Sequence, residues 1–410
     1  MRVGFVAHGP IQVPVGDRHL RASSIGIWCH HVAQAMARRG ARPVVYHEGG
    51  NPEHRVRAFH EYVGDVEYVG FPTGLDRRIR HAMGRRSEVG FGSRWYYPHY
   101  DARVAVDARR RKLDALVIAN FSQTAPVVRR LNPSIEIVLH MHCDWLVQLD
   151  RRTIDRRLRA CDRIGGVTGH VSHAVADRFP QHAARCFTLP NGVDLPEFDD
   201  VGEPDERLIL FVGRCSPEKG LHVLIEAFEE LSRGRPDARL RVVGPTQPAP
   251  RFFIVDVSED PEVRALGRFY DSPTSYHEQL IEMVPDHLRS QVEFAGRRSF
   301  RQVVDEYGRA AVVVLPAVGP ESFGMPVIEA GAAARPVVVT NVGGLPEVVE
   351  DETTGLVVPR NDAPSLAKAL ERLLDDAELR RRMGRQGRTR VVERFTWDVV
   401  AEQLDAQLGR

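Results

Sequence analysis

The chain has 410 residues, which is too long for one ordinary hydrophobic core and predicts two domains. Hydrophobic residues make up 43% of it and charged residues 27%, as in soluble globular proteins. No apolar run approaches the roughly 20 residues of a membrane-spanning helix, and residues 1–9 have the pattern of a strand rather than of a signal peptide. The composition therefore argues against a membrane-spanning chain.

The cysteines and the charges bear on compartment and partners. Five cysteines, with no Cys-x-x-Cys pair, fit a cytoplasmic protein and predict no zinc site. A net charge of +1 gives no reason to expect a nucleic-acid partner. Residues 1–190 nevertheless carry 29 Arg and Lys against 17 Asp and Glu, a net +12, and the other 220 residues carry 27 against 38, a net −11. The basic clusters at 77–80, 109–112 and 151–159 are either solvated helix faces or a surface for an anionic acceptor or a membrane.

Strands and helices alternate in the first half of the chain. Short apolar runs predict buried strands, and apolar residues at helical spacing predict the helices between them. The predicted strands cover residues 2–8, 42–46, 113–119, 135–142, 164–168 and the start of 186–194, and the predicted helices cover 26–39 and 173–179. Residues 74–100, rich in arginine, glycine and aromatic side chains, are predicted to form loops and short helices.

The second half repeats the alternation after an acidic stretch, residues 196–207, that contains proline and glycine and predicts a linker. Strands are predicted at 208–213, 240–244, 292–296 and 310–315, and helices at 221–231, 276–283 and 327–334. We therefore expect two doubly wound α/β domains, over residues 1–195 and 196–394, with a last helix opening at 395–397. The proline-containing stretch 246–290 has no predicted role.

One segment, ESFGMPVIE, joins a buried strand to an alanine-rich helix. The backbone N–H groups of Phe323, Gly324 and Met325 would lie unpaired at the helix start, where they can bind phosphate or sugar oxygens, and Gly324 would leave room for a ligand. Glu321 and Glu329 can flank one bound molecule. The alternative is that the helix dipole simply favours acids near its N-terminus.

Arg214 and Lys219 follow the 208–213 strand and precede the next helix. Two cations at the carboxyl end of a strand, beside a helix N-terminus, can neutralise a diphosphate. The alternative is a surface pair balanced by Glu218. Only three of the 56 basic residues are lysines, at 112, 219 and 368, and this rarity argues modestly against a chance lysine at that position.

His140 and His142 end the 135–142 strand and, two residues apart, share one face of it. Histidines at a strand end can be purely structural. In an open parallel sheet, however, ligands bind beyond the carboxyl ends of the strands, which favours a functional role.

The spacing of Glu321 and Glu329 resembles the E-x7-E motif of retaining GT-B glycosyltransferases, in particular family GT4. The resemblance extends through residues 335–347 and 354–359 and back to 211–220, and the N-terminal half matches more loosely. It implies two Rossmann-like doubly wound domains facing a cleft, with a C-terminal helix, about 395–410, that returns to the first domain. It further implies a nucleotide-sugar donor, an acceptor that the sequence does not identify, and no cofactor.

The resemblance also implies roles for single residues. The first-domain match is weak, because Ser23-Ser24-Ile25-Gly26 stands where the family has a Gly-Gly pair, so that only Gly26 carries over. By this resemblance, Arg214 and Lys219 bind the diphosphate, Glu329 binds the ribose hydroxyls and Arg297 faces the nucleotide base. Glu321 and the amides of Phe323, Gly324 and Met325 bind the donor sugar. His142 lies near that sugar, and His140 is the alternative to it.

Two other functions stay open at this point. No two aspartates lie two positions apart, so the D-x-D metal site of the other glycosyltransferase fold is absent and no metal is expected. A sugar phosphorylase or epimerase on the same fold is one alternative, although Lys219 and Lys368 are poor candidates for a Schiff base with pyridoxal phosphate. A non-catalytic nucleotide-sugar-binding protein is the other, because the Gly-Gly pair is missing. We expect a cytoplasmic, metal-independent, retaining glycosyltransferase.

Overall fold

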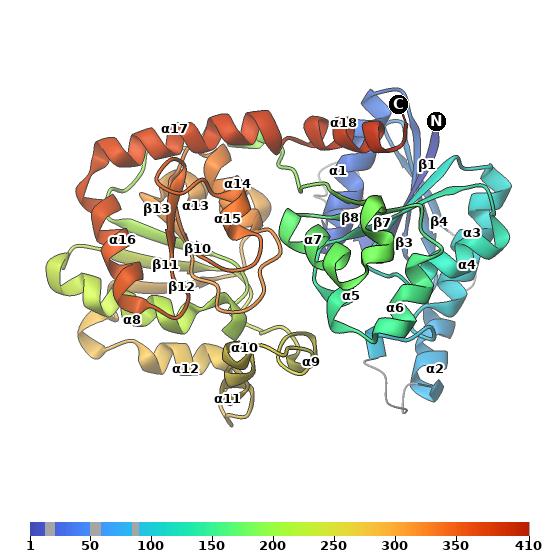
Figure 1. Cartoon of the computed structure of the whole chain (residues 1–410). Coiled ribbons are helices and arrows are strands. Elements are labelled where there is room, and N and C mark those ends of the chain that lie inside the picture. The colour runs from blue at the N-terminus through green and yellow to red at the C-terminus, as the bar shows by residue number, and fades with distance from the viewer. Residues whose placement is uncertain (13–20, 50–58, 84–89, 410) are drawn as a thin grey trace. The chain divides into compact units, whose positions relative to one another are not determined.

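A computed structural model describes residues 1–12, 21–49, 59–83 and 90–409 of the chain. The chain forms two compact units, one of residues 1–191 with 397–410 and one of residues 192–396 (Figure 1). The sequence analysis predicted the boundaries between these units at residues 195/196 and 394/395. Within the described residues, no helix combines the length and the hydrophobicity that crossing a bilayer requires.

The first unit is built on a sheet with the strand order β4-β5-β3-β1-β6-β7-β8-β9, and β2 pairs with β1. Its central strands are buried along their whole length, as in β6, because helices cover both faces of the sheet. The elements are β1 Arg2–Gln12, β2 Arg21–Ala22, α1 Ser24–Arg38, β3 Arg42–Glu48, β4 Phe59–Val63, β5 Val66–Phe71, α2 Gly74–Met83, η1 Gly90–Gly92, α3 Pro98–Arg111, β6 Ala115–Ala119, α4 Thr124–Leu131, β7 Glu136–Met141, α5 Trp145–Gln148, α6 Arg151–Leu158, β8 Arg163–Gly166, α7 Gly169–Arg178, η2 Pro180–Arg185, β9 Cys186–Thr188 and α18 Trp397–Gln407.

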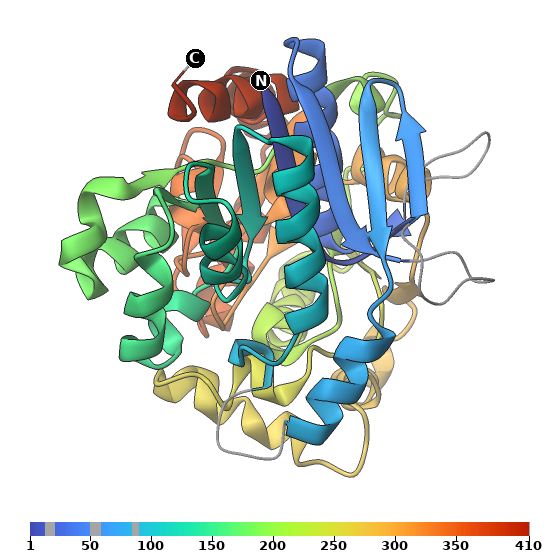
Figure 2. The same ribbon diagram turned by 90° about the vertical axis from the view of Figure 1, so that its right-hand side faces the viewer.

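The last helix of the chain, α18, belongs to the first unit, as predicted. It shares one hydrophobic core with α1 and with those residues of β1 that point to the face of the sheet covered by α1, such as Phe5. Trp397 stacks on His31 of α1 with ring centroids 5.0 Å apart and an interplanar angle of 3°. On the opposite face of the sheet, Tyr100 of α3 packs against Phe71 of β5, and Figure 2 shows α3 in front of the strands.

The antiparallel edge of this sheet was missed by the sequence analysis. β4 pairs antiparallel with β5 through a turn at Gly64, which has a φ of +56° that favours glycine. An edge strand needs no apolar run, because one side of its ladder meets solvent, and Tyr62 is 68% exposed. Only uniformly buried strands give the signal on which the prediction relied.

The second unit has six parallel strands in the order β12-β11-β10-β13-β14-β15, the order of a doubly wound sheet. The helix α8 packs on α16, and α14 packs on α17. The elements are η3 Leu195–Phe198, β10 Leu208–Val212, η4 Pro217–Lys219, α8 Leu221–Gly234, β11 Arg239–Val243, α9 Arg251–Ile254, α10 Pro261–Ala265, α11 Gly267–Tyr270, α12 Tyr276–Met283, η5 Asp286–Leu288, β12 Val292–Gly296, α13 Phe300–Arg309, β13 Val312–Leu315, α14 Met325–Ala332, β14 Val337–Thr340, α15 Leu345–Val348, β15 Gly355–Val358, α16 Ala363–Asp375 and α17 Ala377–Arg394.

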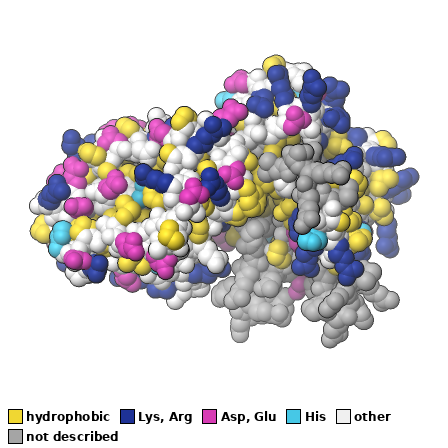
Figure 3. Space-filling model, turned by 90° about the horizontal axis from the view of Figure 1, so that it is seen from below, with side chains coloured by type: hydrophobic (Ala, Val, Ile, Leu, Met, Phe, Trp, Pro, Cys, Tyr) yellow, Lys and Arg dark blue, Asp and Glu magenta, His cyan; other side chains and the backbone are white. Residues whose placement is uncertain are grey.

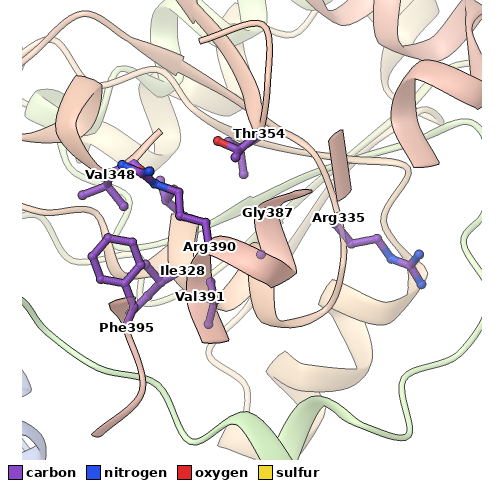
Figure 4. A pocket seen from close by; sticks show the side chains of 11 residues that line it. Ile328, Arg335, Val348, Thr354, Gly387, Arg390, Val391 and Phe395 are labelled. Atoms are coloured by element: carbon purple, nitrogen blue, oxygen red, sulfur yellow. The ribbon is translucent and has the colours of Figure 1, made fainter. Parts of the chain in front are cut away.

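Residues of α14 and α17 take part in lining a small pocket (Figure 4). The lining residues are Val327, Ile328, Gly331, Arg335, Val337, Val348, Thr354, Gly387, Arg390, Val391 and Phe395. A Cβ added at Gly387 of α17 would lie 3.5 Å from the Cα of Gly331, an ordinary contact. A Cβ added at Gly384, one turn earlier in the same helix, would lie 2.1 Å from the carbonyl oxygen of Ala334. The two glycines therefore differ in the room around them.

Gly387→Ala is expected to stabilise the second unit by about 0.5–1 kcal/mol, because alanine is favoured over glycine inside a helix and its methyl group fits. Gly384→Ala is expected to destabilise it by roughly 1–3 kcal/mol, because the methyl group would collide with backbone. The midpoints of thermal unfolding of the two variants and the parent measure this. A Gly384→Ala protein that melts at or above the parent temperature would contradict the packing described here.

Candidate functional site

The candidate residues of the second unit follow two strands that lie side by side. Arg214 and Lys219 come after β10 and Glu321 comes after β13, and these strands pair in the middle of the sheet. The chain connections on the two sides of this pair run in opposite directions, which opens a crevice beyond the carboxyl ends of the strands, where doubly wound proteins bind ligands. The topology therefore brings together residues that are about 100 positions apart in the sequence.

Lys219 forms an ion pair with Glu321, and their side chains are 26% and 14% exposed. Burial alone would lower the pKa of the Lys219 ammonium, but Glu321 and Glu218 outweigh it and raise that pKa. Burial would likewise raise the pKa of the Glu321 carboxyl, but Lys219 outweighs it and lowers that pKa. Both groups are therefore held in their charged forms.

Glu218 is not the surface partner that the alternative interpretation required. Its side chain is buried and accepts a hydrogen bond from the Ser216 hydroxyl. Its backbone carbonyl accepts hydrogen bonds from Val318 and Gly319, which fasten the loop after β13 to the loop after β10. The direct hydrogen-bonding partner of Lys219 is Glu321, and this contact favours a functional pair over a chance surface pair.

The helix-start amides are less free than the sequence predicted. The second oxygen of Glu321 accepts hydrogen bonds from the backbone nitrogens of Phe323, at 3.4 Å, and of Gly324, at 3.0 Å. The prediction that these two amides are unpaired is therefore wrong. An acid just before a helix start can fold back onto amides two and three positions after it, which the spacing of the motif alone did not reveal.

Gly324 has local reasons to be glycine. Its φ of +88° strains any other residue. A Cβ at this position would also lie 2.6 Å from Cδ2 of Leu345. The next residue, Met325, is the first of α14 and is half-buried, and Phe323 is buried edge-on against Phe395 with ring centroids 5.7 Å apart. Backbone geometry and packing thus account for this glycine without a ligand.

Glu329 lies in the middle of α14 and accepts a hydrogen bond of 2.6 Å from the Tyr307 hydroxyl. Burial raises the pKa of the Glu329 carboxyl, and the bond from Tyr307 opposes that rise. Tyr307 lies in the last turn of α13 and is fully buried. Sequence reasoning missed it, since nothing in a single tyrosine 22 positions from a glutamate signals their contact.

Two further predicted cations are exposed. Arg214 follows β10, and its charge lowers the pKa of Lys219, so that the two groups lie within electrostatic reach. Arg297 directly follows β12, at the carboxyl edge of the same sheet. Exposed guanidinium groups at this edge are available to an anionic ligand.

The segment 246–290, which had no predicted role, supports these loops. The backbone nitrogen of Ala249 donates to the Ser216 hydroxyl at 2.9 Å, beneath the loop that carries Lys219. The hydroxyl of Tyr276 in α12 forms a hydrogen bond of 2.8 Å with the ring of His222, which lies in the first turn of α8. Asp260 binds Arg360 at 2.6 Å, which ties the segment to the loop after β15.

In the first unit, the predicted histidines lie at the carboxyl end of β7. His142 is half-buried, and its ring nitrogen Nε2 lies 3.0 Å from Nδ1 of His140, which is fully buried. The backbone nitrogen of His142 donates to the Asn120 side chain at 2.7 Å, so that β6 and β7 hold it jointly. Burial lowers the pKa of His140 to about 4, and burial together with His140 lowers that of His142.

Gly26 lies in the first turn of α1 and is buried. Its backbone nitrogen donates to the hydroxyl of Ser23, the N-cap residue, at 3.2 Å. In the described part of the chain, no three His, Cys, Asp or Glu side chains are grouped so as to hold a metal ion.

Two family models match the chain, one after the other. Residues 25–197 match the model described as Glycosyltransferase Family 4, and residues 196–390 match Glycosyl transferases group 1. The boundary between the two matches falls where the first predicted domain ends.

Curated relatives and solved structures agree with these matches. A D-inositol 3-phosphate glycosyltransferase of Corynebacterium aurimucosum is 36% identical over 48% of the chain, which spans 42% of that protein. A lipopolysaccharide 1,2-N-acetylglucosaminetransferase of Salmonella typhimurium is 24% identical over 94% of the chain and 93% of its own length.

Among solved structures, sucrose-phosphate synthase of Thermosynechococcus elongatus has a TM-score of 0.71 at 21% identity, covering 99% of this chain and 97% of its own. Anabaena HepE, solved in complex with UDP, has a TM-score of 0.68 at 17% identity over the whole of both chains. Taken with the topology of the two sheets, these findings place the chain among the GT4-like glycosyltransferases of the GT-B fold.

Proposed function

We propose that the protein transfers a sugar from a nucleotide-sugar donor to an acceptor, with retention of the anomeric configuration and without a metal ion. The observation that carries the proposal is the charged Lys219–Glu321 pair, which lies just before α14 at the point where the strand order reverses. The solved complex of the similar fold HepE with UDP supports a nucleotide-linked donor.

Roles for the donor-binding residues follow from their chemistry. Lys219 and Arg214 would bind the diphosphate, because cations offset the charge that the leaving group develops. Glu329 would accept hydrogen bonds from the ribose hydroxyls, and Arg297 would lie beside the base. In the second unit, Glu321 and the backbone N–H of Met325 would bind the donor sugar, and the amides of Phe323 and Gly324 would hold the Glu321 carboxylate in place.

The chemical step needs no further acid or base. The bond from the anomeric carbon to the diphosphate oxygen breaks, and a bond to the acceptor oxygen forms on the same face of the sugar. The acceptor proton passes to the leaving phosphate. An inverting transfer would need a base on the opposite face, and no carboxylate is assigned to that role.

A panel of nucleotide sugars tests the proposal. The matching donor, at about 100 times its dissociation constant, should stabilise the folded protein by roughly 2.7 kcal/mol and raise its melting temperature. Slow release of free nucleotide from that donor would distinguish a transferase from a binding protein. If no nucleotide or nucleotide sugar shifts the melting temperature, the proposal is wrong.

We also propose that the basic surface of the first unit meets an anionic acceptor or the surface of a membrane. Arg77 and Arg78 of α2 and Arg109 and Arg110 of α3 are exposed, and Figure 3 shows Lys and Arg side chains gathered over the first unit. Arg111, by contrast, is paired with Glu67 and Asp107. Co-sedimentation with anionic liposomes, compared between the parent and Arg77→Glu/Arg78→Glu, separates a membrane surface from an anionic acceptor in solution.

A further inference from the structure

A buried carboxylate lies beside the cation that we assign to the diphosphate. Glu218 is 5% exposed and directly precedes Lys219. After Glu321, it is the next group that raises the pKa of the Lys219 ammonium against the effect of burial. A further negative charge at this place would repel a bound diphosphate, and burying a charge is costly in itself. The presence of this carboxylate therefore needs an explanation other than ligand binding.

The contacts of Glu218 join two loops of the second unit. Its backbone carbonyl accepts hydrogen bonds from the nitrogens of Val318 at 2.9 Å and Gly319 at 3.0 Å, in the loop that leads to Glu321. Its side chain packs against the same loop, because a Cβ added at Gly319 would lie 2.7 Å from the Cβ of Glu218. Glu218 thus sets the spacing between the loop that carries Lys219 and the loop that carries Glu321.

The hydroxyl of Ser216 holds the Glu218 carboxylate. Ser216 is the N-cap residue of η4 and is fully buried, yet its side chain does not cap that helix. A capping serine accepts a hydrogen bond from a helix amide, whereas this hydroxyl donates its one proton to the Glu218 carboxylate. The same oxygen accepts from the backbone nitrogen of Ala249 at 2.9 Å. Both its donor and its acceptor capacity therefore serve contacts outside the helix end.

Segment 246–290 anchors this hydroxyl from outside the loop. Ala249 is buried and has a proline on either side, which restricts its backbone. Tyr270 of α11 lies within electrostatic reach of Glu218, since burial and then Glu218 raise the pKa of Tyr270 to about 12. The segment therefore packs against the Lys219 loop and presents a restrained N–H to Ser216.

We propose that Ser216 is a positioning residue for Lys219. Anchored by the Ala249 N–H, its hydroxyl holds the Glu218 carboxylate in place. Glu218 in turn keeps Lys219 beside the loop of Glu321, through its contacts rather than through its charge. The effect on a diphosphate rests on the proposed function. The series of hydrogen bonds does not, because all its members belong to the second unit.

Amide hydrogen exchange tests the series of hydrogen bonds without any nucleotide. In Ser216→Ala the Ala249 N–H loses its acceptor and the buried Glu218 carboxylate loses a donor. We expect the amides of Ala249, Val318 and Gly319 to exchange about tenfold faster than in the parent, the effect of losing one hydrogen bond. The amides of β11 should keep their rates. Parental exchange at Val318 and Gly319 in Ser216→Ala would overturn the proposal.

Two matched variants separate the hydrogen bond from the charge and from general stability. Glu218→Gln keeps an oxygen that accepts from the Ser216 hydroxyl but carries no charge. Ser232→Ala removes another buried hydroxyl of the same unit, which donates to the Glu229 carbonyl at 2.8 Å near the other end of α8.

The binding probes are UDP, GDP, ADP and inorganic pyrophosphate, with the corresponding nucleosides as ligands that lack phosphate. We expect Ser216→Ala to raise the dissociation constant of the best-bound diphosphate about tenfold, the value of one hydrogen bond. The dissociation constant of the matching nucleoside, measured by ligand-observed NMR, should stay unchanged. Glu218→Gln and Ser232→Ala should bind the diphosphate at least as tightly as the parent.

Equal losses for diphosphate and nucleoside in Ser216→Ala would refute the positioning role, because general loosening of the unit weakens both. A Glu218→Gln protein that loses as much affinity as Ser216→Ala would refute it too, because the charge would then matter. If Ser216→Ala does not fold, Ala249→Pro removes only the anchoring N–H, and parental diphosphate affinity in that variant would contradict the anchoring. If the proposed function fails, the parent binds no nucleotide, while the exchange at Val318 and Gly319 still responds to Ser216→Ala.

Discussion

Lys219→Ala is expected to lower turnover of the native donor by about 100-fold to 1,000-fold, the cost of removing one group that stabilises charge on a departing oxygen. The substitution also leaves the half-buried Glu321 carboxylate without its cation, next to the expected position of the diphosphate. Two negative groups would then face each other, which should weaken donor binding as well as slow the chemical step.

Steady-state kinetics with a fixed acceptor measures this loss. Lys368→Ala is the matched control, because that lysine is exposed on α16, away from the predicted site residues in sequence. Arg214→Ala should resemble Lys219→Ala, and the double variant should lose less than the two single losses combined if both side chains bind one diphosphate. A folded Lys219→Ala protein with nearly full activity would show that the diphosphate assignment is wrong.

Glu329→Ala should weaken nucleotide binding by roughly 1.5–3 kcal/mol, the range for hydrogen bonds to a charged group. That loss corresponds to about 10-fold to 150-fold in the dissociation constant. Titration calorimetry with the nucleoside diphosphate measures it, and a 2′-deoxy nucleotide should lose part of the same affinity in the parent protein. Equal affinity of parent and variant would exclude Glu329 from ribose binding.

Tyr307→Phe is the companion variant, because it keeps the Glu329 carboxylate and removes only its hydrogen-bond donor. The bond from Tyr307 favours the ionised form and so lowers the pKa of Glu329. Without it that pKa rises further, and the carboxylate takes up a proton at higher pH. Nucleotide affinity should therefore begin to fall at a higher pH in Tyr307→Phe than in the parent as the pH is lowered. If nucleotide affinity falls at the same pH in Tyr307→Phe and in the parent, the coupling of the two side chains is contradicted.

The sequence predicted elements best where the signal was local. The helix Tyr276–Met283 and the strand Val292–Gly296 are confirmed to the residue, since each is an uninterrupted pattern with clear ends. Other ends differ: α7 begins at Gly169 rather than at residue 173, and α14 spans Met325–Ala332 rather than 327–334. The first turn of α14 contains a proline and follows a glycine, which weakens a periodic signal.

The site was predicted in its residues but not in their contacts. The pairing of Lys219 with Glu321 and of Tyr307 with Glu329 depends on strands and helices that the fold brings together, and no spacing rule reports it. The fold-back of Glu321 onto the Phe323 and Gly324 amides was missed because the same spacing also fits free amides. Side-chain contacts of this kind become visible only once the backbone is placed.

Retaining transfer without a metal is the central claim, and one product analysis tests it directly. The purified protein is incubated with EDTA, methanol as a simple acceptor, and the α-linked nucleotide sugar that stabilises it most, and the methyl glycoside is examined by proton NMR. A methyl glycoside cannot change its anomeric configuration, so the small α-type coupling that we predict for a gluco-configured product reports the chemical step itself. A large, β-type coupling, or formation of the glycoside only when a divalent metal is restored, would contradict it.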